Sequence, residues 1–146
     1  MPSGGTAGAV RRVVVVGAGH GGFQLAASMR QHGFDGEVVL IGDEPHLPYQ
    51  RPPLSKDYLS GKIGLDLLLM RPESFFREQR IELVSGRPAA EIDRADKCVV
   101  LSTKARIDYD HLVLATGARN RVPALPGVEL DGVCYLRTLA ETDELR

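Results

Sequence analysis

The amino-acid sequence predicts an α/β fold: a mainly parallel sheet with flanking helices and a small antiparallel β-meander. Val13–Val16 are four β-branched residues in succession, typical of a strand buried on both faces. A helical segment of about residues 22–32 separates this run from a second apolar run, residues 37–42, so the order is β-α-β. Short β-like runs between residues 87 and 109, divided by turn-forming residues, predict the meander.

A glycine motif directly follows the first strand. Gly17, Gly19 and Gly22 have the spacing G-x-G-x-x-G, and Gly21 lies within the same turn. The first glycine permits a tight turn, the second lets the backbone approach a pyrophosphate, and the third allows close packing of helix on strand. The following helix directs free N–H groups and its positive dipole end toward the phosphates. The motif therefore predicts a dinucleotide site.

An acidic residue, Asp43, ends the second predicted strand, at about the 20-residue distance from the last glycine that such sites show. A carboxylate at this position accepts hydrogen bonds from ribose hydroxyls and repels a 2′-phosphate. An ordinary strand–turn–helix with an acidic strand end is the alternative. The register of strand, glycine turn and acid favours the nucleotide site.

The composition of the chain gives no indication of a nucleic-acid-binding or membrane protein. The chain has 146 residues, enough for one domain, and a formal net charge of −1, which gives no indication of nucleic-acid or membrane-surface binding. Tryptophan is absent, and no apolar run is long enough to cross a bilayer. Residues 1–10 resemble a flexible tail rather than a signal peptide, so we expect a cytoplasmic protein.

The cysteines and histidines indicate neither a metal site nor a local disulfide. Cys98 and Cys134 are far apart, each within an apolar run, and we expect both to be buried, reduced thiols. The histidines lack the spacing of metal ligands. We therefore assign no metal.

Between the glycine unit and the meander lies a proline-rich segment, residues 43–56, with four prolines in nine residues. Such a segment forms neither a regular helix nor a central strand, and loops at strand ends often carry function. We expect it to lead into a short helix, Leu54–Ser60, that stops at Gly61. The further elements that the sequence predicts are a helix over 72–79 and strands over 81–84, 89–92, 98–101, 106–109, 111–115 and 133–136.

The end of the chain carries the capping-box pattern T-x-x-E, formed by Thr138 and Glu141, which predicts a helix that starts at Thr138. Because isolated helices this short are marginal in water, we expect the helix to lead into a further part of a longer protein. A short docked terminal helix is the alternative.

Four segments together resemble the FAD-dependent pyridine nucleotide-disulphide oxidoreductases: VVVVGAGHGGFQLA, IGDE, PHLPYQRPPLSK and DYDHLVLATGAR. Within that superfamily the chain is most similar to the ferredoxin and rubredoxin (putidaredoxin-type) reductases, from about Arg12 to the last residue. The resemblance implies a Rossmann-like FAD-binding domain. It also implies a reductase that passes electrons from NAD(P)H through FAD to a small iron–sulfur protein, a ferredoxin or rubredoxin.

The resemblance also implies a set of cofactor-binding residues and no catalytic residue. They are Gly17, Gly19, Gly21 and Gly22 at the pyrophosphate, Asp43 at the ribose, and Arg51, Lys56, Ala89, Thr116, Gly117 and Arg137 at other parts of FAD. Lys56 and Arg137 resemble cations beside the flavin, where a fixed positive charge stabilises the reduced ring. The backbone of Ala89 matches a position that pairs with the adenine edge. For both cations, an ordinary place on the solvated surface is the alternative.

Members of this family continue into an NAD(P)H domain with its own glycine motif, and this sequence has no second such motif. The expected organisation is therefore a tail over 1–10, the N-terminal part of the FAD/NAD(P)-binding domain over 11–137, and the start of a helix leading to an NAD(P)H domain over 138–146. Such a part should retain FAD weakly or not at all, tend to self-associate and lack NADH-dependent activity.

Other functions stay open from the sequence. One is the FAD domain of an NADH oxidase, a nitrite reductase or an apoptosis-inducing-factor-like protein. Another is a nucleotide-binding module without catalysis, and a third is a simple NAD dehydrogenase, which the proline-rich lysine loop disfavours. The segment PPLSK stands where disulfide reductases carry their redox cysteines, so a dithiol mechanism is disfavoured as well.

Overall fold

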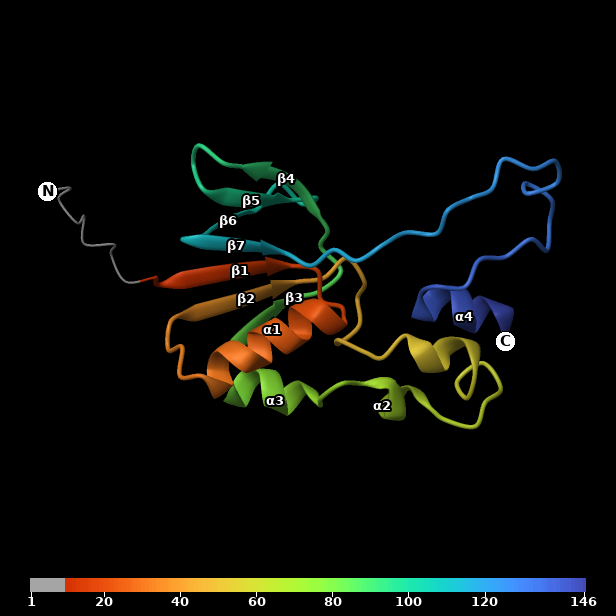
Figure 1. Cartoon of the computed structure of the whole chain (residues 1–146), viewed down its shortest axis with the longest axis horizontal. Coiled ribbons are helices and arrows are strands. Elements are labelled where there is room, and N and C mark those ends of the chain that lie inside the picture. Colours follow the sequence, from red (N-terminus) through yellow and green to blue (C-terminus); the bar gives the residue numbers. More distant parts are fainter. Residues whose placement is uncertain (1–9) are drawn as a thin grey trace, which may run out of the picture.

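The computed structural model describes residues 10–146 and consists of two sheets with helices (Figure 1). The parallel sheet has the order β3-β2-β1-β7. Its strands are β1 (Arg12–Val16), β2 (Glu37–Ile41), β3 (Ile81–Val84) and β7 (His111–Leu114). The antiparallel sheet has the order β4-β5-β6, with β4 (Ala89–Asp93), β5 (Cys98–Leu101) and β6 (Arg106–Asp108). The predicted α/β fold with a meander is confirmed.

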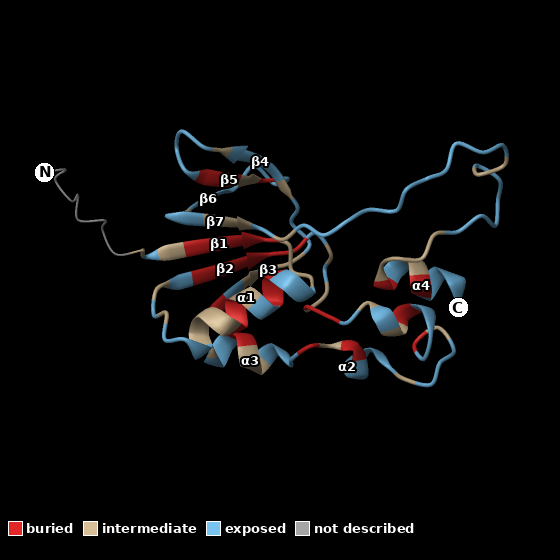
Figure 2. Ribbon diagram, in the orientation of Figure 1, coloured by how far each residue is buried: buried red, intermediate tan, exposed pale blue. Residues whose placement is uncertain are grey.

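Helices and meander cover opposite faces of the parallel sheet (Figure 1). Helix α1 (His20–Gln31) and helix α3 (Glu73–Glu78) lie on one face, where Val13 and Val15 pack with Phe23 and Phe76. On the other face, alternate residues of β1 and β2 pack with β5 of the meander. Successive side chains of a strand point to opposite faces, so a run of four valines is buried on both sides, as predicted (Figure 2).

A third apolar cluster lies away from the sheet. Its buried members are Tyr49, Leu54, Tyr58, Leu68 and Leu139. They join the segment of residues 49–69 to helix α4 (Leu139–Leu145), and we call residues 49–69 and 136–146 the α4 lobe. Figure 1 shows α4 beside this segment and separated from the sheet by the long connection that follows β7.

Within the α4 lobe the structure differs from the predicted helix over 54–60. A 3₁₀-helix, η1 (Pro52–Ser55), takes its place and is followed by turns, and a short helix α2 (Leu65–Leu68) was not predicted. The carbonyl of Pro53 accepts the N–H groups of both Lys56, at 3.0 Å, and Tyr58, at 3.1 Å. Because η1 begins with two prolines and its hydrogen bonds span three residues, the chain tightens instead of extending an α-helix.

Two further predictions were wrong in the connection after β7. Residues 133–136 form no strand, because the apolar side chain of Leu136 packs against the third apolar cluster rather than onto a neighbouring strand. Cys134 is exposed, whereas Cys98 is buried in β5 as expected.

Helix α1 starts at His20, two residues before the predicted start. No helix in the part of the chain that the structure describes combines the length and apolar character that a membrane span needs.

The loop between α1 and β2 is held by a single guanidinium. Arg30 donates to the carbonyl oxygens of Phe34, Gly36, Gln79 and Arg80, each at 2.7 Å. Burial and the neighbouring Arg80 lower the pKa of Arg30. This one side chain therefore joins the end of α1, the entry to β2 and the entry to β3.

Helix α4 begins with the predicted capping box. Glu141 Oε2 accepts the N–H groups of Arg137 at 2.7 Å and Thr138 at 2.8 Å, and Thr138 Oγ1 accepts the N–H of Glu141. Burial pushes the pKa of Glu141 up, but these hydrogen bonds outweigh it and hold the pKa below its ordinary value. The cap is therefore strongest when Glu141 is ionised.

We expect α4 to loosen in acid through this residue. A carboxyl whose pKa is depressed on folding contributes stability above its unfolded pKa, about 4.3, and loses it as the pH falls through the lower folded pKa. Amide chemical shifts of α4 followed against pH should show this transition, and Glu141→Gln should remove it. The matched variant Glu144→Gln, an exposed acid of the same helix, should keep it. An unchanged profile in Glu141→Gln would contradict the role.

Candidate dinucleotide site

The glycine turn between β1 and α1 is a point of close backbone packing. Gly17 has a φ of +113°, and a Cβ there would lie 2.2 Å from the carbonyl oxygen of Ala115. A Cβ on Gly22 would lie 1.8 Å from the carbonyl oxygen of Gly17. These two positions thus admit only glycine because the chain itself fills the space.

Gly19 differs, because its surroundings are open. Gly19 is the N-cap of α1, with an ordinary φ of −76°, and a Cβ there would meet no atom of residues 10–146 within 4 Å. No side chain caps the helix, and its first turn holds no acidic residue. A Cβ on Gly21 would likewise meet nothing. The start of α1 therefore offers backbone N–H groups to open space, as an anion site requires.

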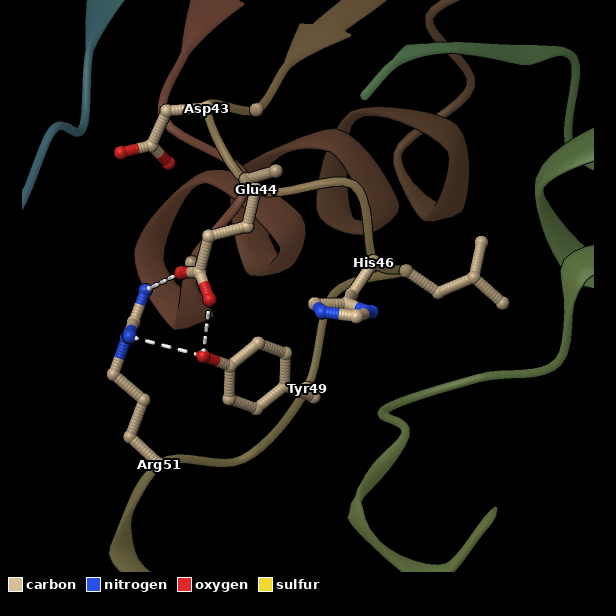
Figure 3. A pocket seen from close by; sticks show the side chains of 9 residues that line it. Asp43, Glu44, His46, Tyr49 and Arg51 are labelled. Atoms are coloured by element: carbon tan, nitrogen blue, oxygen red, sulfur yellow. Dashed lines mark hydrogen bonds and ion pairs between the residues drawn. The ribbon is translucent and has the colours of Figure 1, made fainter. Parts of the chain in front are cut away.

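A small pocket lies beside this turn, at the end of β2 (Figure 3). Its lining residues are Ala18, Gly19, Gly42, Asp43, Glu44, His46, Leu47, Tyr49 and Arg51. The turn and the strand end are in contact, since a Cβ on Gly42 would lie 2.9 Å from that of Ala18. The structure therefore brings Gly19, Asp43 and Arg51 to one pocket, with the last two both contributed by the proline-rich segment.

Glu44, Tyr49 and Arg51 form a hydrogen-bonded cluster on the pocket wall. Arg51 Nη2 pairs with Glu44 Oε1 at 2.6 Å, and the Tyr49 hydroxyl donates to Glu44 Oε2 at 2.6 Å. Arg51 Nη1 donates to the Tyr49 hydroxyl at 3.1 Å. Burial and the bond to Glu44 raise the pKa of Tyr49 above its ordinary value, so the hydroxyl keeps its proton.

The two acids of the pocket are consequently not equivalent. Both carboxylate oxygens of Glu44 accept hydrogen bonds within the cluster. Asp43 is exposed, and in Figure 3 its carboxylate points away from the cluster. Asp43 is therefore the acid that is available to ribose hydroxyls, although its role toward a nucleotide stays a prediction.

Several other predicted residues meet near the end of β7. A Cβ on Gly17 would lie 2.9 Å from the backbone nitrogen of Thr116, and a Cβ on Gly117 would lie 3.2 Å from Nη2 of Arg137. Arg51 Nη1 donates to the carbonyl oxygen of Arg137 at 2.8 Å. The glycine turn, the end of β7 and both arginines therefore lie in one region.

Of the predicted residues, Gly19, Asp43 and Arg51 line this pocket. Lys56 and Ala89 neither line it nor belong to the region at the end of β7. Lys56 is exposed at the end of η1 and does not line the pocket. Ala89 is half-buried at the start of β4, where a β-bulge interrupts the ladder before Glu91. Their contacts with FAD stay predictions.

Sequence reasoning missed Glu44 and Tyr49 as members of the site. Tyr49 stands within the segment PHLPYQRPPLSK, and nothing in its spacing indicates that its hydroxyl reaches Leu139. Within residues 10–146, no group of three or more His, Cys, Asp and Glu side chains is placed to hold a metal ion.

The chain is similar to known proteins in both sequence and structure. The sequence profile of the family described as pyridine nucleotide-disulphide oxidoreductase matches residues 11–146. Rhodocoxin reductase of Rhodococcus erythropolis is 50% identical over 133 residues, which are 91% of this chain and 31% of that protein. Rubredoxin-NAD(+) reductase of Ectopseudomonas oleovorans is 39% identical over 134 residues, 92% of this chain and 35% of that protein.

Solved structures agree with these matches. The ferredoxin reductase for the CYP199A2 system of Rhodopseudomonas palustris superposes with a TM-score of 0.87 at 51% identity, over 92% of this chain and 33% of that one. Putidaredoxin reductase, in its covalent complex with putidaredoxin, superposes with a TM-score of 0.83 at 40% identity, over 91% of this chain and 33% of that one. The chain thus spans about a third of the length of the relatives it matches.

Proposed function

The chain belongs to the pyridine nucleotide-disulphide oxidoreductase family, and we propose that its glycine turn and Asp43 bind FAD. The observation that carries this proposal is the open space at Gly19, in front of the uncapped start of α1. A side chain would fill this space, whereas Gly17 and Gly22 are constrained by the chain itself. The fold itself does not require glycine at position 19. A pyrophosphate that approaches the backbone at the start of a helix would require it.

In this proposal each part of the pocket has a separate task. The first N–H groups of α1 hold the pyrophosphate, and Asp43 accepts hydrogen bonds from the adenosine ribose. Of the five N–H donors of an arginine, three in Arg51 are used by Glu44, Tyr49 and Arg137, which leaves two for the cofactor. Arg51 is thereby held in place before a ligand arrives.

We further propose that the chain is the FAD-binding part of an NAD(P)H-dependent reductase of the ferredoxin or rubredoxin type. FAD, when bound, takes a hydride from NAD(P)H and releases single electrons to an iron–sulfur protein. Lys56 and Arg137 would place positive charge beside the flavin. The names of the relatives, rhodocoxin reductase and rubredoxin-NAD(+) reductase, support this proposal.

The proposed organisation keeps a tail over 1–10, which lies almost wholly outside the described residues, an FAD domain over 11–137 and a helix over 138–146 that leads to an NAD(P)H domain. The capping box that starts α4 at its predicted position supports the last boundary. We also propose a cytoplasmic location, since Cys98 and Cys134 are both free thiols, as is usual in reducing compartments.

Titration distinguishes FAD from NAD as the ligand. Added FAD should lose fluorescence as it binds to the purified chain, and excess NAD should not displace it. Quenching that NAD reverses at similar concentrations would instead indicate a simple NAD-binding module.

Replacing Asp43 tests the ribose contact. Asp43→Ala should weaken FAD binding by about 1.5–3 kcal/mol, the contribution of hydrogen bonds to a charged group. Asp35→Ala is the matched control, because Asp35 is an exposed acid just before the opposite end of β2. Equal FAD affinity of the Asp43 variant and the wild type in fluorescence titration would reject the role of Asp43.

Turnover by the 146-residue chain tests the proposed organisation. With FAD, NADH and ferricyanide we expect rates far below the ordinary enzyme range of about 1–10³ s⁻¹, because hydride transfer needs donor and acceptor held together. Rates within that range would mean that the chain is a complete enzyme.

A further inference from the structure

The Tyr49 hydroxyl connects two parts of the molecule that are distant in sequence. It donates to Glu44 on the pocket wall and accepts hydrogen bonds from Arg51 Nη1, at 3.1 Å, and from the backbone N–H of Leu139, at 3.0 Å. A hydroxyl has one donor and two acceptor positions, so all of its hydrogen-bonding capacity is used. Tyr49 is 5% exposed, and water cannot readily replace a lost partner.

The same wall holds the start of α4 at a second point. Arg51 donates to the carbonyl oxygen of Arg137 at 2.8 Å, and Leu139 provides the first N–H of the helix, one of those without an intrahelical partner. The first turn of α4 is thus fixed by side chains that line the dinucleotide pocket. The second tyrosine of the α4 lobe, Tyr58, binds Asp143 at 2.7 Å but does not line the pocket.

We propose that Glu44, Tyr49 and Arg51 couple the dinucleotide pocket to helix α4, with Tyr49 as the positioning residue. The identity of the ligand rests on the proposed function, whereas the coupling rests on this cluster alone. Among the described residues, Glu44 forms hydrogen bonds with Tyr49 and Arg51 rather than with α4, and it thereby fixes the hydroxyl and the guanidinium that do contact the start of the helix. A ligand that engages Arg51 therefore alters the hold on α4, and by linkage the position of α4 alters the affinity of the pocket.

The first test needs no ligand and follows hydrogen exchange of the Leu139 amide in the full chain. Tyr49→Phe keeps the packed ring but removes the acceptor, and Glu44→Gln weakens the cluster at a distance from α4. Both should speed this exchange about two- to tenfold, as expected for the loss of one hydrogen bond to a neutral hydroxyl. Asp43→Asn is the matched control: it changes the neighbouring pocket acid, lies outside the cluster and should leave exchange unchanged. Unchanged exchange in Glu44→Gln would overturn the coupling.

The second test adds FAD, with binding verified by flavin fluorescence. Saturating FAD should change Leu139 exchange about fivefold or more in the wild type, the usual size of a coupling between sites. Tyr58→Phe should keep this response and Tyr49→Phe should lose it. Bound FAD without any response in the wild type, or an equal response in Tyr49→Phe, overturns the proposal. If the wild type binds no FAD, the result concerns the proposed function alone, and the ligand-free test decides the coupling.

Discussion

Gly19→Val should fold normally and fail to bind FAD. A Cβ at this position meets no atom of residues 10–146 within 4 Å, and the φ of −76° suits any residue, so the backbone here tolerates a side chain. The same side chain would stand between the N–H groups of α1 and a pyrophosphate. Because the hydrogen bonds lost involve a charged group, we expect binding to weaken by at least about 2 kcal/mol in fluorescence titration.

Gly22→Ala is the informative contrast. Its Cβ would lie 1.8 Å from the carbonyl oxygen of Gly17, so even one methyl group forces the strand and helix apart. We expect this variant to lose stability in thermal unfolding, whereas Gly19→Val keeps the wild-type transition. If Gly19→Val binds FAD as tightly as the wild type, the pyrophosphate does not lie at this turn.

A large loss of stability is expected when the guanidinium of Arg30 is removed. Arg30→Met keeps much of the aliphatic stem but leaves four carbonyl oxygens without their donor. Since these hydrogen bonds involve a charged donor but are partly accessible to solvent, we expect the free energy of unfolding to fall by about 2–4 kcal/mol. Urea denaturation measures the change.

Arg94→Met serves as the control for lost charge, because Arg94 is exposed in the turn between β4 and β5. Its effect should stay within about 0.5 kcal/mol, as for most surface substitutions. Equal stability of the two variants would show that the α1–β2 loop does not depend on Arg30.

The strands and the glycine turn could be predicted from the sequence because their determinants are local. The four valines of β1 require burial on both faces wherever they occur, and G-x-G-x-x-G specifies a turn before any tertiary contact forms. The capping box at Thr138 is local as well, and α4 starts where it was predicted.

The features that could not be predicted depend on contacts between segments that are far apart in sequence. The cluster of Glu44, Tyr49 and Arg51 holds α4 through hydrogen bonds with the backbone of Arg137 and Leu139. These two residues lie more than 80 positions away in sequence. The apolar run 133–136 was mistaken for a strand for the same reason: apolar character indicates burial of Leu136, but it does not say whether a strand or a lobe covers it.

The connection after β7 has a consequence for how the sequence can vary. Almost all residues from 116 to 134 are exposed, and the position of α4 is set after this stretch, by the contacts of Tyr49 and Arg51 with residues 139 and 137. Lengthening a flexible loop costs little, about 0.6 kcal/mol for each doubling. Insertions and deletions within residues 118–134, beyond the predicted cofactor-binding residues Thr116 and Gly117, should therefore be tolerated, because the contacts of Tyr49 and Arg51 still hold α4 in place.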